Sequence, residues 1–239
     1  MSNIRRNIEE LTEIKKGQTG TGLLIEHDGH IIGNSDVVSQ IREDIDKGHK
    51  FVIPDNFVVS AVFQKYGIKN ANGRIYPENI LKREVQKYLE NQVANHRAVG
   101  ALDHPASSTL SGHDITHNIL DLRWEGRTLV GEMKLHLSPG FKQYGICSTS
   151  GDLVASMIMD GIQVGVSSRA LGSVEQKMGV LMVGDDLELV CWDVVLEPST
   201  SNAWIAQDPK DLQPYIESEI KNGTLMSEKI DKIKSILEN

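Results

Sequence analysis

The alternation of side chains along residues 162–169 constrains the fold of this chain more than any other feature of its sequence. Successive side chains of an extended strand point to opposite faces, so the β-branched residues share one face while Ser167 and Arg169 share the other. Ser168 belongs to the apolar face. A serine hydroxyl beside a guanidinium and a glycine is typical of a nucleophile with an oxyanion site. A polar strand end that closes into a glycine turn is the alternative interpretation.

A candidate general base lies in residues 99–105, where a short apolar strand ends at His104 and Pro105. The proline restrains the residue before it to an extended conformation. An imidazole that projects from the end of a strand on a restrained backbone suits a general base. The other seven histidines lie in turns, at a helix end or along a strand. A simple His-Pro turn remains the alternative.

Asp193 lies within a nearly continuous apolar run, residues 187–198, of the kind that forms a strand buried on both faces. Strict alternation places Asp193 on the same face as Leu187, Leu189 and Cys191. A buried carboxylate is costly unless it has a hydrogen-bonding partner. An imidazole is one suitable partner, and the backbone amides of a neighbouring strand are another.

Four segments resemble, in order and spacing, the prohead core proteases of myovirus-type tailed bacteriophages. The segments are residues 70–77, 102–105, 165–173 and 193–204, and the resemblance spans residues 51–204. That family is a branch of serine proteases similar in fold to the herpesvirus capsid maturation protease. The resemblance therefore implies a closed or partly closed β-barrel flanked by helices. From the residues themselves, strands interleaved with a few helices predict only an α+β fold.

The resemblance also implies the roles of the site residues. Ser167 corresponds to the nucleophile, His104 to the base and Asp193 to the acid. The predicted reaction is acyl transfer, in which His104 takes the proton of Ser167 and Asp193 holds the imidazole tautomer. Backbone amides would stabilise the oxyanion, with Ser168 and Arg169 in support. Arg169 is equally suited to fixing a loop through hydrogen bonds to carbonyl groups.

The substrates implied by the resemblance are phage scaffold or core proteins, the major capsid protein and the protease itself. Cleavage is expected after glutamate in a Leu/Ile-x-Glu context. Leu24, Ile25 and Glu26 form such a tripeptide, followed by an Asp-Gly pair that is typical of an exposed hairpin turn. Exposed loop tips are preferred sites of nicking, so we expect self-cleavage after Glu26.

Three units are expected along the chain. Residues 1–50 form an N-terminal extension that is either docked on the main domain or a removable arm. Residues 51–205 form the protease domain, which includes a helix beginning near Pro77 and a second helix at residues 152–160. The second helix leads directly into the strand of Ser167. Residues 206–239 form a polar linker and a helical C-terminal tail.

Composition excludes several classes of protein. The net charge of −8 provides no basic surface for direct nucleic-acid binding. Two cysteines supply neither a disulfide framework nor a cysteine-based metal motif, and a reducing compartment is expected. No apolar run is long enough for a membrane span. We therefore expect an intracellular protein without cofactor or metal, and the resemblance implies that it acts in the host cytoplasm, inside the assembling prohead. A homo-oligomer is compatible with the sequence.

Two other functions compete with the serine protease. His113 and His117 are four residues apart, so one helical face could present both to zinc together with His104 or Asp114. This segment lacks the catalytic glutamate of the familiar zinc-protease motif. A non-catalytic prohead core or scaffold protein is the second alternative. The presence of all three candidate catalytic residues argues against it.

Overall fold

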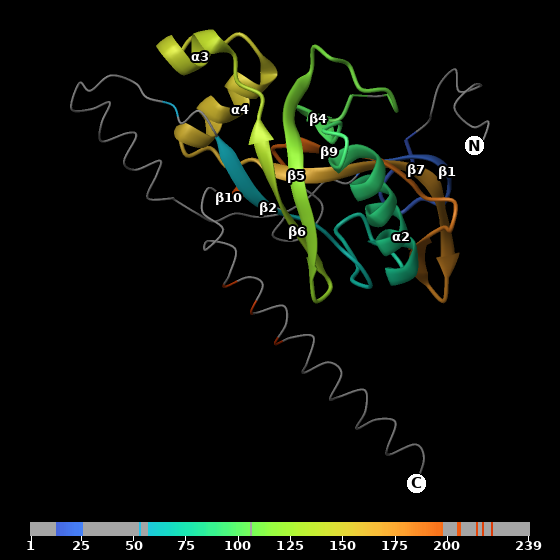
Figure 1. Ribbon diagram of the computed structural model, residues 1–239. Helices are drawn as coiled ribbons and strands as arrows, with labels where there is room; N and C mark the ends of the chain where they lie inside the picture. The colour runs from blue at the N-terminus through green and yellow to red at the C-terminus, as the bar shows by residue number, and fades with distance from the viewer. Residues whose placement is uncertain are drawn as a thin grey trace.

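The computed structural model of the 239-residue chain describes residues 13–25, 53, 57–105, 107–197, 205–206, 214, 217 and 221. Within these residues the chain forms two five-stranded sheets and a few helices, which confirms the α+β prediction (Figure 1). The first sheet contains β1 (Gly20–Ile25), β3 (Arg74–Ile75), β7 (Gly165–Lys177), β8 (Val180–Val183) and β9 (Glu188–Val195). The second contains β2 (Val58–Lys65), β4 (Val99–Ala101), β5 (Ile115–Glu125), β6 (Thr128–Leu135) and β10 (Ile205–Ala206).

Helices α3 and α4 begin at side-chain caps that the sequence supplies, whereas α2 begins without one. Helix α2 (Glu78–Tyr88) follows Pro77 and continues into a π-helical turn at Leu89–Val93. Helix α3 (Pro139–Tyr144) begins after Ser138, whose hydroxyl accepts a hydrogen bond from a backbone amide of the first turn. Helix α4 (Ser150–Met159) opens with a capping box between Thr149 and Asp152. It ends just before β7, close to the predicted range of 152–160.

Antiparallel pairing places β7 at the centre of the first sheet, between β1 and β9. In the second sheet the strand order is β10-β2-β6-β5-β4. Trp192 of β9 lies in the core between the two sheets, where its ring packs edge-on against Phe63 of β2 and Tyr88 of α2. This aromatic packing fixes β9 against the second sheet, so one face of β9 is buried in the core and the other is left for the polar site.

The resemblance implied a closed or partly closed barrel, and the closed form is not found among the described strands. The two sheets approach each other at two edges. Leu102, just beyond β4, forms a single bridge with Val194 of β9, and the amide of Ile205 donates to the carbonyl of Val164 at 3.1 Å. Strand β4 is only three residues long, and Asp103 has a left-handed backbone (φ +59°) that turns the chain away. Among the described residues, the pairing between β4 and β9 therefore ends at this single bridge.

The N-terminal segment contributes a strand to the first sheet. Strand β1 begins at Gly20, and all six of its residues pair with β7. Glu26 and the predicted hairpin turn lie outside the described residues, as does most of the expected C-terminal tail. Within the described part of the chain, no helix has the length and apolar character to cross a membrane.

Candidate active site

The register between β7 and β9 places the polar residues of both strands on one face. Ser167 lies directly opposite Asp193, and Arg169 lies opposite Cys191. Directly opposed residues of an antiparallel pair project to the same side of the sheet. Ser168 lies opposite Trp192, on the core face. This arrangement agrees with the alternation that separated Ser167 from Ser168 in the sequence.

A bulge changes the alternation along β9. The register shifts between Arg169 and Ala170, so that Leu189 pairs with Ala170 rather than with a residue on the polar face. Leu187 and Leu189 therefore join the hydrophobic core. The prediction that these two leucines share a face with Asp193 was wrong, because the extra residue of a bulge reverses the phase of every residue beyond it.

His104 reaches this face from the end of β4. The amide of Asp103 donates to the carbonyl of Val194 at 2.8 Å, which holds the turn against β9. The imidazole then lies between the other two residues: Nδ1 is 2.7 Å from Oδ2 of Asp193, and Nε2 is 2.9 Å from Oγ of Ser167. A carboxylate can only accept hydrogen bonds, so Nδ1 carries the proton and Nε2 is placed to accept the serine proton.

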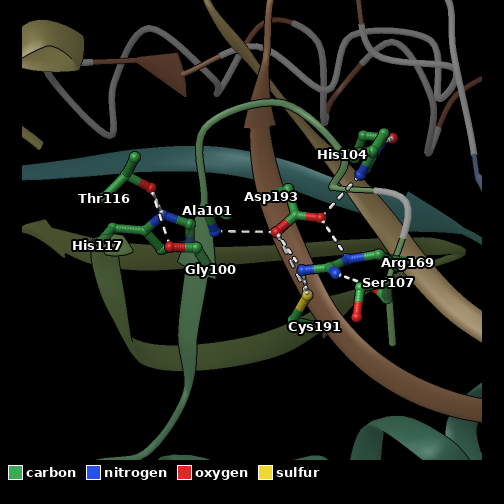
Figure 2. A network of polar contacts seen from close by, with 10 residues as sticks. Gly100, Ala101, His104, Ser107, Thr116, His117, Arg169, Cys191 and Asp193 are labelled. Carbon is green, nitrogen blue, oxygen red and sulfur yellow. Dashed lines mark hydrogen bonds and ion pairs between the residues drawn. The ribbon is translucent and has the colours of Figure 1, made fainter. Parts of the chain in front are cut away.

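Asp193 is fully buried and receives hydrogen bonds from several directions (Figure 2). Oδ1 accepts from the amide of Ala101 at 2.9 Å and from Nη2 of Arg169 at 3.1 Å. Oδ2 accepts from His104 and from Nε of Arg169 at 2.9 Å. Burial by itself raises the pKa of Asp193, but the His104 hydrogen bond and the Arg169 charge outweigh it and lower the pKa. The carboxylate is therefore ionised at neutral pH.

Arg169 connects three parts of the site. Its guanidinium holds Asp193 through two nitrogens, donates to the carbonyl of Ser107, and contacts Sγ of Cys191 at 3.2 Å. Ser107 belongs to the loop that follows His104. The side chain of Arg169 is fully buried, so these partners compensate a charge that has lost its contact with water. Arg169 therefore fastens the His104 loop to the two strands that carry Ser167 and Asp193.

Gly100 was not singled out from the sequence, although it decides how closely β4 approaches β9. A side-chain carbon at this position would lie 2.0 Å from the carbonyl oxygen of Trp192 and 2.6 Å from Cε1 of His117. Only glycine allows this approach, which brings the amide of Ala101 to Asp193. A glycine inside a short apolar strand is a known signal of close backbone contact and could have identified the position.

The zinc alternative fails on geometry. His113 lies in an exposed turn, whereas His117 lies on β5 with its ring buried beside Gly100, so the two do not share a helical face. Nδ1 of His117 is 2.8 Å from the hydroxyl of Thr116. Across the ranges that the structure describes, no group of three or more histidine, cysteine, aspartate or glutamate residues could hold a metal ion.

His117 is expected to make the fold sensitive to acid. Burial lowers its pKa to about 4, partly opposed by the charge of Asp193. Between this value and the ordinary value of about 6.5, the unfolded chain binds more protons than the folded chain. Stability therefore falls as the pH decreases through this window, by up to about 3 kcal/mol. In urea denaturation at several pH values, the free energy of unfolding of His117→Gln should change less with pH than that of the parent.

The exposed His113 provides the matched control for this measurement. His113→Gln should retain the full acid dependence, because this side chain is exposed at the surface and its replacement leaves the buried His117 in place. Equal pH profiles for the parent and the His117 variant would contradict the role assigned to His117.

Comparisons with known proteins agree with this architecture. A family model described as the prohead core protein serine protease matches residues 18–215. The prohead core protein protease of Enterobacteria phage T4 is 31% identical over 156 residues, which cover 64% of this chain and 69% of that protein. The solved structure of the bacteriophage T4 capsid assembly protease is similar with a TM-score of 0.56 and 25% identity. That match covers 74% of this chain and 98% of the T4 chain.

Proposed function

This chain belongs to the prohead core serine protease family of bacteriophages, and from that premise we propose that His104, Ser167 and Asp193 form its catalytic triad. The observation that carries the proposal is the continuous hydrogen-bonded path from Oγ of Ser167 through both nitrogens of His104 to Asp193. The three residues come from β7, from the turn after β4 and from β9. A triad is recognised by such geometry and not by chain order.

The geometry suits acyl transfer by a general base. Nε2 of His104 accepts the Ser167 proton as Oγ attacks the carbonyl carbon of the substrate, which forms a tetrahedral oxyanion. The imidazolium then gives that proton to the departing amine, and the acyl group stays on Ser167 as an ester. In the second half, His104 takes a proton from water, the resulting hydroxide attacks the ester, and the proton returns to Oγ. Asp193 remains ionised throughout and stabilises the imidazolium.

Arg169 supports this site as a positioning residue in our proposal. Its guanidinium nitrogens are engaged by Asp193, Ser107 and Cys191, so releasing one toward an oxyanion would disconnect the carboxylate or the His104 loop. Backbone amides are therefore the better candidates for the oxyanion site. Ser168 contributes its backbone, because its side chain projects toward the core face.

The proposed substrates are the core or scaffold proteins and the major capsid protein of the same phage, cut after glutamate in Leu/Ile-x-Glu sequences inside the assembling prohead. Self-cleavage after Glu26 belongs to the same proposal. Ser167 is only 2% exposed, so little of this residue is in contact with water. Residues 51–205 remain the proposed protease domain, and the two contacts between sheet edges support a partly closed, herpesvirus-protease-like barrel.

The test is a processing reaction with the core and capsid proteins of the phage, run in parallel without and with a fluorophosphonate that labels activated serines. Mass spectrometry should find new N-termini after Leu/Ile-x-Glu and the label on Ser167, and the label should stop processing. Processing that continues with Ser167 fully labelled, or a label on a different serine, would contradict the triad. If the core and capsid proteins stay intact under conditions of prohead assembly, the result would favour the alternative of a non-catalytic core protein.

A further inference from the structure

The turn before β3 and the first residue of β3 contribute two buried polar side chains that the catalytic site does not use. Asn72 and Arg74 are 5% and 1% exposed. The turn is shaped by Asn70, whose carbonyl accepts from the amide of Gly73 and whose side chain accepts from the amide of Arg74, both at 2.9 Å. Gly73 has a left-handed backbone (φ +83°) that favours glycine. This geometry aims Asn72 and Arg74 at a distant part of the chain.

Both side chains bind carbonyl groups of the N-terminal segment. Nδ2 of Asn72 donates to the carbonyl of Ile25 at 3.1 Å, and Nη1 of Arg74 donates to the same carbonyl at 3.3 Å. Nη2 of Arg74 donates to the carbonyl of Ile14. Asn72 and Arg74 therefore form a clamp that holds the segment at two points eleven residues apart in sequence. The amide of Ile14 also donates to the carbonyl of Leu23 at 2.9 Å, which closes the segment on itself.

The clamped segment is well packed. Four of its aliphatic side chains are buried, each no more than 5% exposed: Ile14, Leu23, Leu24 and Ile25. Every residue of β1 pairs with a residue of β7, from Gly20 opposite Val174 to Ile25 opposite Arg169. A strand with this much buried apolar surface and a full ladder does not need a covalent link to stay bound.

The end of β1 lies beside the proposed catalytic residues. Ile25 is directly opposite Arg169, so their side chains project to the same face of the sheet. Ser167 lies on β7 two residues before Arg169. Arg169 is fully buried, which strengthens its interaction with Asp193. Removing β1 would open the edge of β7 at Arg169 to water. The clamp on Ile25 thus acts on the site through β1 and Arg169.

We propose that β1 is a retained, functional strand of the active-site sheet, held by the Asn72–Arg74 clamp, and that cleavage after Glu26 nicks the chain without releasing it. This inference rests on the proposed function where it concerns catalysis and self-cleavage. Asn72 and Arg74 are then positioning residues. Processing at Glu26 leaves the enzyme active, and dissociation of the strand switches it off.

Retention of the strand can be tested without catalysis. In full-length Ser167→Ala protein, a recognition sequence for an unrelated site-specific protease is inserted after Glu26 and cut. The N-terminal fragment should then co-elute with the body of the protein in gel filtration. Asn72→Ala combined with Arg74→Gln should weaken retention by at least about tenfold, because three hydrogen bonds to carbonyls are lost. Arg74→Lys replaces the forked guanidinium by a single ammonium group. Its retention of the fragment should lie between that of the parent and that of the double variant.

Arg83→Gln is the matched control. Arg83 lies on α2 and pairs with Glu84 and Asp185, away from the clamped carbonyls, so this variant should retain the fragment fully. Circular dichroism verifies that each variant is folded. Dissociation of the fragment from the cut protein with an intact clamp would overturn the proposal, whatever the clamp variants do.

Activity is measured on the same cut protein with Ser167 present. The nicked enzyme should keep its kcat/KM, and stripping the fragment in mild urea should lower kcat by about a hundredfold, as expected when a site is misplaced by about 1 Å. A synthetic peptide of residues 13–26, added to the stripped enzyme, should restore kcat. Full activity of the stripped enzyme would overturn the proposal. If the fragment is retained but the protein never cleaves the core or capsid proteins, the proposed function is refuted and the retention of the strand is not.

Discussion

Ser167→Ala is expected to lower the rate of substrate cleavage by about 10⁴-fold or more while leaving the fold intact. The hydroxyl is the only group of the network placed to attack a carbonyl, because Nε2 of His104 lies 2.9 Å from its oxygen. The replacement removes one oxygen and leaves the ladder with β9 unchanged. The rate is measured by mass spectrometry of core-protein cleavage, and the stability by urea denaturation.

Ser168→Ala is the matched control, because the neighbouring hydroxyl is equally buried but lies on the opposite face of β7. This variant should retain much of the parent activity. An inactive Ser168 variant together with an active Ser167 variant would show that the assignment of the two faces is reversed.

Asp193→Asn is expected to impair both catalysis and stability. The rate should fall by about 10⁴-fold, because an amide can donate to Nδ1 of His104 and thereby stabilise the wrong tautomer. The free energy of unfolding should fall by about 3–5 kcal/mol, because the buried Arg169 loses its ionic partner. These two losses are separated by measuring kcat under conditions in which the variant is fully folded.

The pH dependence of stability provides an independent readout for the same variant. The folded pKa of Asp193 is lowered, so its contribution is present above the unfolded value and is lost as the pH falls through the folded value. Asp193→Asn should remove this part of the acid dependence. Asp121→Asn, at an exposed position on β5, is the control and should change neither rate nor stability. Parent-like activity of Asp193→Asn would remove Asp193 from the triad.

Local patterns in the sequence were sufficient for the features that depend on neighbours along the chain. The period of two in an extended strand separated Ser167 from Ser168, and apolar spacing located the helix that leads into β7. A single carboxylate in an apolar strand indicated a buried, partnered Asp193. The three residues of the proposed triad were each identifiable in this way, because each has an unusual local context.

Only the tertiary structure decided which of these residues meet and what holds them. The bulge that moves Leu187 and Leu189 into the core depends on the pairing of β9 with β7, and the approach of β4 depends on the space beside Gly100. The partners of Arg169 and the binding of β1 by Arg74 join segments far apart in the chain. Sequence periodicity describes the faces of one strand, whereas register and partner choice are set by packing between strands, which no local pattern contains.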